Sequence, residues 1–168
     1  MTTIVVRPAR LEEHAALCAL FEELDAFHRE GRPELFRAFA GPARPRDQIE
    51  RWLAGPGSTV LVAEEAGEEE AGDLAGDLVG LAVLLTRPSS AFAGAVPRKV
   101  IELDNLVVRA DRRGRGIGER LLAEMRRWAR AEGATHIEVG VHAFNSDARR
   151  FYERFGFARS IDRLMLAA

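Results

Sequence analysis

A run of arginines and glycines at residues 112–118 carries the clearest chemical signal in this sequence. It reads Arg-Arg-Gly-Arg-Gly-Ile-Gly and precedes apolar residues at helical spacing, so its last glycines open a helix. The first amides of a helix have no acceptor within it and carry the positive end of its dipole. Glycine lets a ligand approach that backbone closely. The run therefore predicts a phosphate site, with a turn that uses glycine for geometry alone as the competing interpretation.

Two carboxylates, Glu102 and Asp104, lie two residues apart before this run. On a strand, that spacing places both side chains on one face, where either can accept a proton directly or through water. A substrate-positioning or purely structural role is the alternative. We expect no metal, because no cluster of His, Cys, Asp and Glu has metal-ligand spacing. We also expect no covalent intermediate, because the single cysteine, Cys18, falls in an apolar helical pattern.

Residues 100–128 form the unit that must position these groups. Apolar and acidic residues alternate from Val100 to Asp104, which is the period of a half-buried strand. The alternation fails from Asn105 onward, which predicts a β-bulge or burial on both faces. An apolar stripe at helical spacing then starts at Ile117. A strand therefore leads into a glycine-rich turn, and the turn opens a helix.

Two common phosphate loops do not match this run. A Walker loop needs Gly-Lys-Ser/Thr, but the only lysine of the chain is Lys99, before the strand. The dinucleotide fingerprint G-x-G-x-x-G, counted from the first glycine, needs glycine where Glu119 stands. The pattern Arg113-x-x-Gly116-x-Gly118 instead resembles the acyl-CoA pyrophosphate loop of the GCN5-related N-acetyltransferase (GNAT) superfamily.

A second segment, residues 142–157, strengthens this resemblance. In the family a strand ends in asparagine, a short helix carries a tyrosine, and the helix stops at an aromatic-Gly-Phe turn. Asn145, Tyr152 and the Phe-Gly-Phe ending at Phe157 follow that order here. The similarity covers residues 102–157. It implies an α/β fold, a single domain over residues 1–168 with a central mixed, mostly antiparallel β-sheet flanked by helices on both faces.

The resemblance also implies roles for individual residues, with acetyl-CoA as the cofactor. Tyr152 stands where the family protonates the CoA sulfur or donates a hydrogen bond to it. Glu102 occupies a general-base position of some members, and Asp104 an acidic position common in others. Main-chain amides after the bulge are expected to support the oxyanion. The residues placed on the cofactor are Leu106, Val107, Val108, Arg113, Gly114, Arg115, Gly116, Ile117, Gly118, Asn145 and Tyr152. A core-capping ring for Tyr152 and a helix cap for Asn145 are the structural alternatives.

Hydrophobic periodicity and breaker residues predict the remaining elements. Strands are expected over residues 3–7, 58–64, 77–85, 135–141 and 157–166, and helices over residues 11–27, 46–53 and 148–155. Ser146 is a plausible cap for the last helix. Phe27 and His28 precede an irregular stretch and border the predicted acceptor side of the cleft. An acidic stretch before residue 77 is predicted to be a solvated loop rather than a cation site.

Composition limits the class of protein. With 168 residues, 47% hydrophobic and 30% charged, the chain suits a soluble globular protein. A net charge of −2 gives no reason to expect nucleic acid. The sequence has no apolar run long enough for a membrane helix and no signal-peptide pattern, so we expect a cytoplasmic protein. Homodimers are frequent in the resembled family, so a homodimer is an expectation by analogy.

Two functions from different classes fit these observations. The first is an acetyl-CoA-dependent N-acetyltransferase that moves an acetyl group to a primary amine, on a small molecule or a peptide, by direct transfer in a ternary complex. The second is a non-catalytic acyl-CoA-binding sensor or scaffold, because fold alone does not determine function. Retention of Tyr152 and of both strand carboxylates favours the enzyme. The identity of the amine cannot be read from the sequence.

Overall fold

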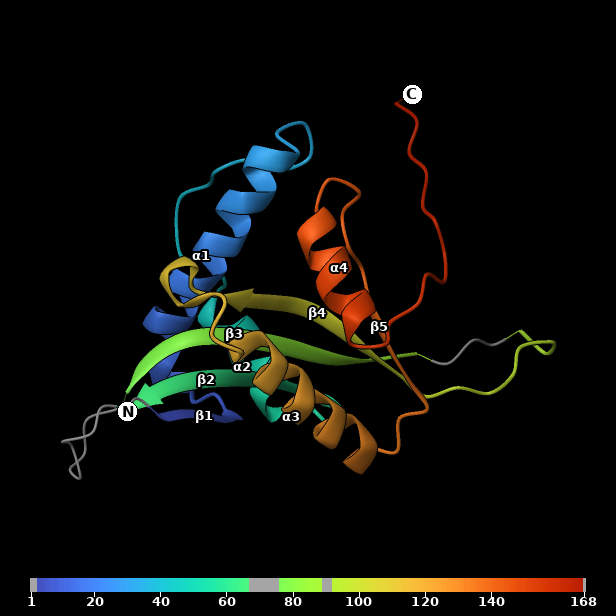
Figure 1. The fold of residues 1–168 in the computed structure, drawn as a ribbon, viewed down its shortest axis with the longest axis horizontal. Helices are drawn as coiled ribbons and strands as arrows, with labels where there is room; N and C mark the ends of the chain where they lie inside the picture. The colour runs from blue at the N-terminus through green and yellow to red at the C-terminus, as the bar shows by residue number, and fades with distance from the viewer. Residues whose placement is uncertain (1–2, 67–75, 89–91, 168) are drawn as a thin grey trace.

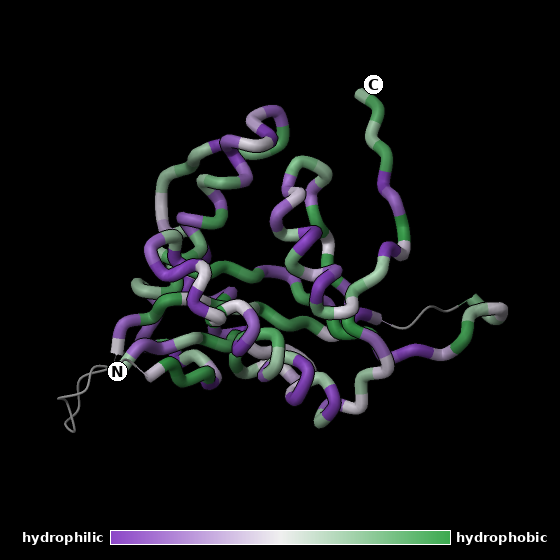
Figure 2. Tube along the Cα trace, viewed as in Figure 1, coloured by the Kyte–Doolittle hydropathy of each residue, from purple (hydrophilic) through white to green (hydrophobic). Residues whose placement is uncertain are grey.

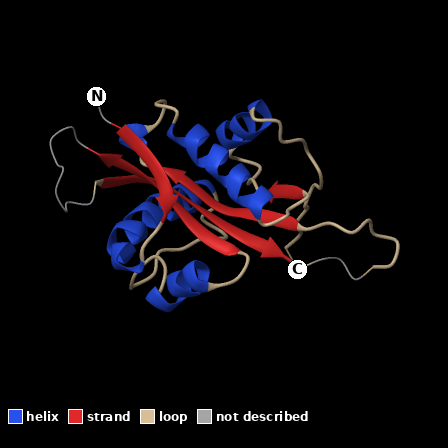
Figure 3. Ribbon diagram, turned by 90° about the horizontal axis from the view of Figure 1, so that it is seen from below, coloured by secondary structure: helices blue, strands red, loops and turns tan. Residues whose placement is uncertain are grey.

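A five-stranded sheet with helices on both faces forms the body of the protein (Figures 1 and 3). The computed structural model describes residues 3–66, 76–88 and 92–167. The strands lie in chain order: β1 (Thr3–Pro8), β2 (Ser58–Ala66), β3 (Asp77–Arg87), β4 (Val100–Val108) and β5 (His136–Val139). Neighbours from β1 to β4 are antiparallel, and β5 is parallel to β4. The predicted mixed, mostly antiparallel sheet is confirmed.

The helices divide between the two faces of this sheet. Helices α1 (His14–Gly31) and α2 (Arg46–Ala54) pack on one face, where Val60, Val62 and other strand residues meet Phe21 and Ile49. Helices α3 (Ile117–Ala131) and α4 (Ser146–Arg154) cover the opposite face, which includes Leu61. Successive strand residues therefore enter different cores, as the period of two requires. Single 3₁₀ turns, η1 (Leu11–Glu13) and η2 (Ala110–Arg112), precede α1 and α3.

A bulge in β4 confirms one of the two explanations for the broken alternation. Val83 of β3 pairs with Asn105 and Leu84 pairs with Leu103, so Asp104 is the extra residue. The bulge exchanges the two faces of β4. Leu103 packs toward α3 and α4, whereas Val107, four residues later, packs toward α1 and α2.

Strands β4 and β5 separate where this bulge occurs. Their pairing runs from Val100 with His136 to Leu103 with Val139, and there β5 ends. Strand β4 continues to Val108. Residues 105–108 are therefore paired with β3 on one edge, and among the described residues no strand lies on their β5 side. An added extended chain could use the main-chain groups on that side.

Several predicted element boundaries were wrong. Helix α1 extends through His28 to Gly31, and β5 is shorter than the expected strand over residues 135–141. Helix α4 is capped by Asn145, not Ser146, because the Asn145 side chain accepts a hydrogen bond from Ala148 N. The expected strand over residues 157–166 is absent from the described chain, because that segment finds no strand to pair with. The predicted acidic loop falls largely on residues 67–75, outside the described residues.

Candidate active site

The glycine-rich turn presents open backbone at the start of α3. Gly114 and Gly116 have φ of +75°, a conformation that side-chain-bearing residues rarely adopt. A Cβ built on either glycine would meet no atom within 4 Å. The first helical hydrogen bond runs from Arg120 N to Gly116 O, so the amides of residues 117–119 have no helical acceptor. The turn therefore has the geometry of an anion nest, with free space above it.

Position 118 requires glycine for a different reason, the packing of α3 against α4. A Cβ there would lie 3.1 Å and 3.4 Å from two ring carbons of Phe151, on α4. Gly118 thus allows the first turn of α3 to approach α4 closely. Ile117 is buried in the core, so only its backbone can face a ligand. The predicted cofactor role of these two residues is therefore limited to their main-chain groups.

The arginines of the turn are held by carboxylates of the protein. Arg113 donates from Nε to the carbonyl of Val108 at 2.9 Å and from a terminal nitrogen to Glu23 of α1 at 2.7 Å. Arg112 is paired with Glu65 at 2.7 Å. Arg115 lies 4.0 Å from Glu65 and its side chain is 59% exposed. Arg115 is thus the most weakly held of the three, while Arg113 ties the turn to β4 and α1.

The two predicted carboxylates differ in their surroundings. Glu102 is paired with Arg87 of β3. Asp104 accepts a hydrogen bond from the side chain of Asn105, next to it at the bulge. Although Asp104 as a residue is exposed, partial withdrawal of its carboxyl from water raises its pKa, and the charge of Glu102 raises it further. Arg44 and Arg87 act in the opposite direction. Asp104 therefore binds a proton more readily than an ordinary aspartate does.

Arg44 connects α1 to the bulge, and sequence patterns alone missed it. Its guanidinium makes two hydrogen bonds to Asp25 of α1, at 2.8 Å and 3.1 Å, and one to Asn105 at 3.4 Å. It also stacks 4.5 Å from the ring centre of Phe21. Only contacts with residues distant in sequence reveal this role. Arg44 fixes the position of α1 over the segment where β4 and β5 separate.

A cluster of aromatic and imidazole rings joins the end of α1 to the loop between β5 and α4. His28 lies 5.1 Å from His142 and 5.4 Å from Phe36, measured between ring centres. Phe27, the other predicted acceptor-side residue, lies 5.5 Å from Phe144. Burial lowers the pKa of His28, and the nearby His142 lowers it further. This ring cluster (Phe27, His28, Phe36, His142 and Phe144) therefore contains an imidazole that favours its neutral form.

The ring cluster depends on a close approach at Gly31. A Cβ on Gly31 would lie 2.2–2.7 Å from three ring carbons of Phe144, so a larger residue would push the loop away from α1. Sequence reasoning found Phe27 and His28 but not Phe36, His142 or Phe144. The only sequence feature these three positions share is an aromatic residue or histidine at each of residues 36, 142 and 144. It predicts a cluster only once the end of α1 and the loop before α4 are known to lie together.

Tyr152 lies on α4 with its ring in the core and its hydroxyl available. The residue is 8% exposed and packs against Phe151 and Phe157. Among the described residues, every buried side-chain nitrogen or oxygen has a hydrogen-bond partner. The Tyr152 hydroxyl makes no hydrogen bond to a described residue, so it must be accessible to solvent. Burial raises the pKa of Tyr152, so the phenol stays protonated at neutral pH and can donate a hydrogen bond.

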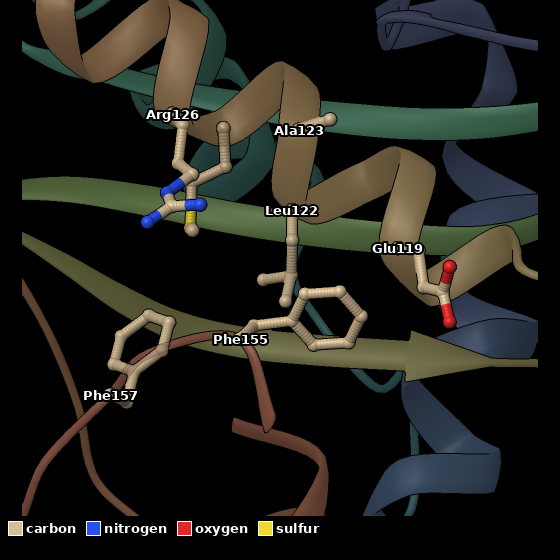
Figure 4. Close-up of a pocket in the computed structure, with 7 residues that line it drawn as sticks. Glu119, Leu122, Ala123, Arg126, Phe155 and Phe157 are labelled. Carbon is tan, nitrogen blue, oxygen red and sulfur yellow. The ribbon is translucent and has the colours of Figure 1, made fainter. Parts of the chain in front are cut away.

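A shallow pocket lies outside this arrangement (Figure 4). It has a volume of about 210 Å³ between α3 and the turn that ends α4. Its lining residues are Glu119, Leu122, Ala123, Met125, Arg126, Phe155 and Phe157. None of the candidates for proton transfer is among them. Within the described ranges, no helix is long and apolar enough to cross a membrane, and no cluster of three or more His, Cys, Asp or Glu residues could hold a metal ion.

Comparison with known proteins places this arrangement in a family. The model of the acetyltransferase (GNAT) family matches residues 19–157. The chain belongs to that family. It is 26% identical over 152 residues to YhfO, an uncharacterized N-acetyltransferase of Bacillus subtilis, with 90% of this chain and 88% of that protein covered. The predicted class of enzyme, an N-acetyltransferase, is confirmed at this level.

Solved structures confirm the fold of this GNAT chain. A tetramutant of a Bacillus halodurans protein superposes with a TM-score of 0.85 at 23% identity, covering 98% of this chain and 99% of that one. The aminoglycoside N-acetyltransferase AAC(6')-Iy, solved with CoA, superposes with a TM-score of 0.73 at 16% identity, covering 100% of this chain and 96% of that one. Glucosamine-6-phosphate N-acetyltransferase of Arabidopsis thaliana superposes with a TM-score of 0.68 at 13% identity, covering 98% of each chain. These likenesses concern the fold, and do not assign a substrate to this chain.

Proposed function

We propose that this GNAT chain transfers an acetyl group from acetyl-CoA directly to a primary amine, with both substrates bound together. The separation of β4 from β5 at the Asp104 bulge is the observation that carries this proposal. Residues 105–108, between the strand carboxylates and the nest before α3, therefore have no described strand on the β5 side. An extended cofactor arm could pair with that edge as an additional strand would.

The nest fits the pyrophosphate of CoA. Its two positive-φ glycines leave open space for an anion, and the unpaired amides of α3 point the positive end of the helix dipole at it. Arg115 is exposed and adds charge. When bound, acetyl-CoA supplies an acyl carbon open to attack and a thiolate leaving group. Main-chain groups of Leu106, Val107 and Val108 would lie beside that carbon and would support the developing oxyanion.

Asp104 is the better candidate to accept the amine proton. Glu102 is engaged by Arg87, so its carboxylate oxygens are less available to a substrate amine. Asp104 makes no such pair among the described residues, and its pKa is raised. Asp104 would take the proton of the attacking amine, directly or through water, while the C–N bond forms, and CoA would leave as a thiolate when the C–S bond breaks. Solvent remains the alternative acceptor of the proton.

Tyr152 is suited to stabilise the departing sulfur. Because burial raises its pKa well above that of a thiol, full proton transfer from the phenol to the thiolate would be uphill. A hydrogen bond from the phenol to the sulfur is therefore the proposed role. Asn145 uses its side-chain oxygen to cap α4, and its side-chain NH₂ group, which has no hydrogen-bond partner among the described residues, is the group proposed to contact the cofactor arm.

The amine acceptor is proposed to lie beside the ring cluster, to which the last turns of α1 contribute Phe27 and His28. The cluster offers apolar ring faces, and the strand carboxylates offer negative charge for an ammonium group. A small-molecule or peptide amine fits this combination.

The decisive experiment measures free thiol released from acetyl-CoA in the presence of a panel of amines: polyamines, amino sugars, amino acids and peptide N-termini. Release that depends on one class of amine supports the enzyme. Tight CoA binding with no release on any amine would instead favour the non-catalytic sensor. Gly116→Asp serves as the control, because thiol release that persists undiminished in this variant would not come from the proposed site.

A further inference from the structure

Arg44 lies in the loop before α2 and is held there by α1 at two points. Its main-chain carbonyl accepts a hydrogen bond from His14 Nε2 at 2.8 Å, at the start of that helix. Its guanidinium donates two hydrogen bonds to Asp25, further along the same helix. The side chains of Arg44 and Asp25 are only 18% and 19% exposed, so this ion pair is largely withdrawn from water. Main-chain and side-chain contacts together therefore fix the guanidinium.

The same guanidinium decides which way the Asn105 amide faces. Arg44 donates to Asn105 Oδ1 at 3.4 Å, and Asn105 Nδ2 donates to the carboxylate of Asp104. A guanidinium only donates hydrogen bonds and a carboxylate only accepts them, so the amide fits between the two groups in one orientation. Turned over, the amide would set its NH₂ group against Arg44 and its oxygen against Asp104. Arg44 thus keeps the donor of Asn105 directed at Asp104.

Four groups act on the carboxyl of Asp104, in addition to its partial withdrawal from water. Glu102, on the same strand, raises its pKa. The positive charges of Arg44 and of Arg87 on β3 lower it, as does the hydrogen bond from Asn105. Arg87 is engaged with Glu102. Arg44 and Asn105 are therefore the pair of residues that directs a hydrogen-bond donor at Asp104 itself.

Helix α1 brings Arg44 close to the acceptor side of the site as well. Hydrophobic and hydrophilic stretches follow one another along this helix (Figure 2). Asp25 precedes His28 of the ring cluster by about one turn. The charge of Asp25 raises the pKa of His28, and the charge of Arg44 lowers it. Arg44 is therefore within electrostatic range of both the ring cluster and Asp104.

We propose that Arg44 is a positioning residue for acetyl transfer, and that it acts through the Asn105 amide to hold the Asp104 carboxylate in place as the proton acceptor. This inference rests on the proposed function, in which Asp104 takes the proton of the amine. Without Arg44 the amide is free to turn, and Asp104 loses both a nearby positive charge and an oriented donor. Its carboxylate is then less stable relative to its protonated form.

Arg44→Met tests this role, because methionine keeps an unbranched apolar chain beside Phe21 and cannot donate a hydrogen bond. Two midpoints should move to higher pH: that of the acidic limb of kcat/KM, and that of the Asp104 carboxyl followed by carbon NMR. At a pH on this limb, kcat/KM should fall at least about twofold, with a smaller change on the plateau. A folded Arg44→Met protein with both midpoints at their wild-type positions overturns the proposal.

Asn105→Ala approaches the same link from its other end. It leaves the ion pair of Arg44 with Asp25 intact, so it decides the question even if Arg44→Met does not fold. Both midpoints should again move to higher pH, because Asp104 loses its donor. In the Asn105→Ala background, Arg44→Met should add a smaller shift than it produces in wild type, because the amide through which it acts is gone. An equal shift in both backgrounds, or no shift for Asn105→Ala, contradicts the proposal.

Arg51→Met is the matched control. Arg51 pairs with Asp47 on α2, and its side chain is 68% exposed, so its loss removes an arginine–aspartate pair away from the site. Both midpoints should stay at their wild-type positions, and thermal unfolding checks that each variant folds. The carboxyl titration uses the free protein and needs no turnover.

The two proposals fail in different ways. If Asp104→Asn keeps the acidic limb, Asp104 is not the base, and the proposed proton transfer fails whatever the carboxyl titration shows. If Asp104→Asn loses the limb but Arg44→Met leaves both midpoints in place, only the role of Arg44 fails. A shift of both midpoints in Arg44→Met, together with loss of the limb in Asp104→Asn, supports both proposals.

Discussion

Gly116 and Gly133 offer a matched test of the phosphate nest. Gly116 precedes α3 at φ of +75°, and Gly133 follows it at φ of +72°. A Cβ on either would meet nothing within 4 Å. Alanine at either position should therefore cost only the strain of a left-handed backbone, about 1–2 kcal/mol. For a chain of this length that lowers Tm by roughly 2–8 °C. The two alanine variants should be equally destabilised, as measured by thermal unfolding.

Aspartate at the same two positions separates ligand binding from backbone strain. At position 116 the carboxylate would face the pyrophosphate. Two unit charges about 5 Å apart interact by roughly 3 kcal/mol at an effective dielectric constant of about 20. Screening by salt and movement of the side chain reduce this, so we expect a loss of at least about 1.4 kcal/mol, a tenfold weaker Kd for CoA. Gly133→Asp stands at the opposite end of the helix and should bind CoA like wild type.

Isothermal titration calorimetry with CoA, on samples shown to be folded, provides the measurement. The reasoning fails if Gly116→Asp binds CoA with wild-type affinity. It also fails if Gly116→Asp and Gly133→Asp weaken binding equally, since the effect would then be general destabilisation. Raising the salt concentration should reduce the penalty of Gly116→Asp, because the repulsion is electrostatic.

Three further predictions concern proton transfer and stability. Asp104→Asn should lower kcat/KM and remove the acidic limb of the pH–rate profile, where activity rises with pH as Asp104 loses its proton. Glu102→Gln should keep that limb. Equal pH–rate profiles for both variants and wild type would point to solvent as the base. Tyr152→Phe should lower kcat about 10²-fold with KM for acetyl-CoA nearly constant, and a kcat within about twofold of wild type would reduce the ring to a wall of the pocket. Burial alone would raise the pKa of Glu13, but hydrogen bonds from Arg7 and from the Arg10 amide lower it to about 2. Because that pKa lies below its unfolded value of 4.5, the carboxylate contributes roughly 3 kcal/mol of stability above about pH 4.5, which is lost as pH falls toward 2. Glu13→Gln should remove most of this pH dependence in urea unfolding, and an unchanged curve would contradict it.

The sequence by itself determined the local part of this site. The turn at residues 114 and 116 can be predicted from its glycines, because a left-handed backbone excludes most other residues. The failed alternation at Asn105 located the bulge within one residue, because the period of two is a property of the backbone. Asn145 just before α4 and Tyr152 on that helix also lie where the short family motif placed them. These signals are readable because each depends on a few consecutive residues.

Only the tertiary structure decided how these pieces face one another. Arg44 contacts Asn105, which lies 61 residues away in the sequence. A single arginine in a loop belongs to no local sequence pattern that would predict this contact. The ring cluster joins His28 to His142 in the same way. Residues 157–166 show the opposite case. The sequence predicted a strand there, but a strand forms only beside another strand that accepts and donates its main-chain hydrogen bonds, and the described part of this segment pairs with none.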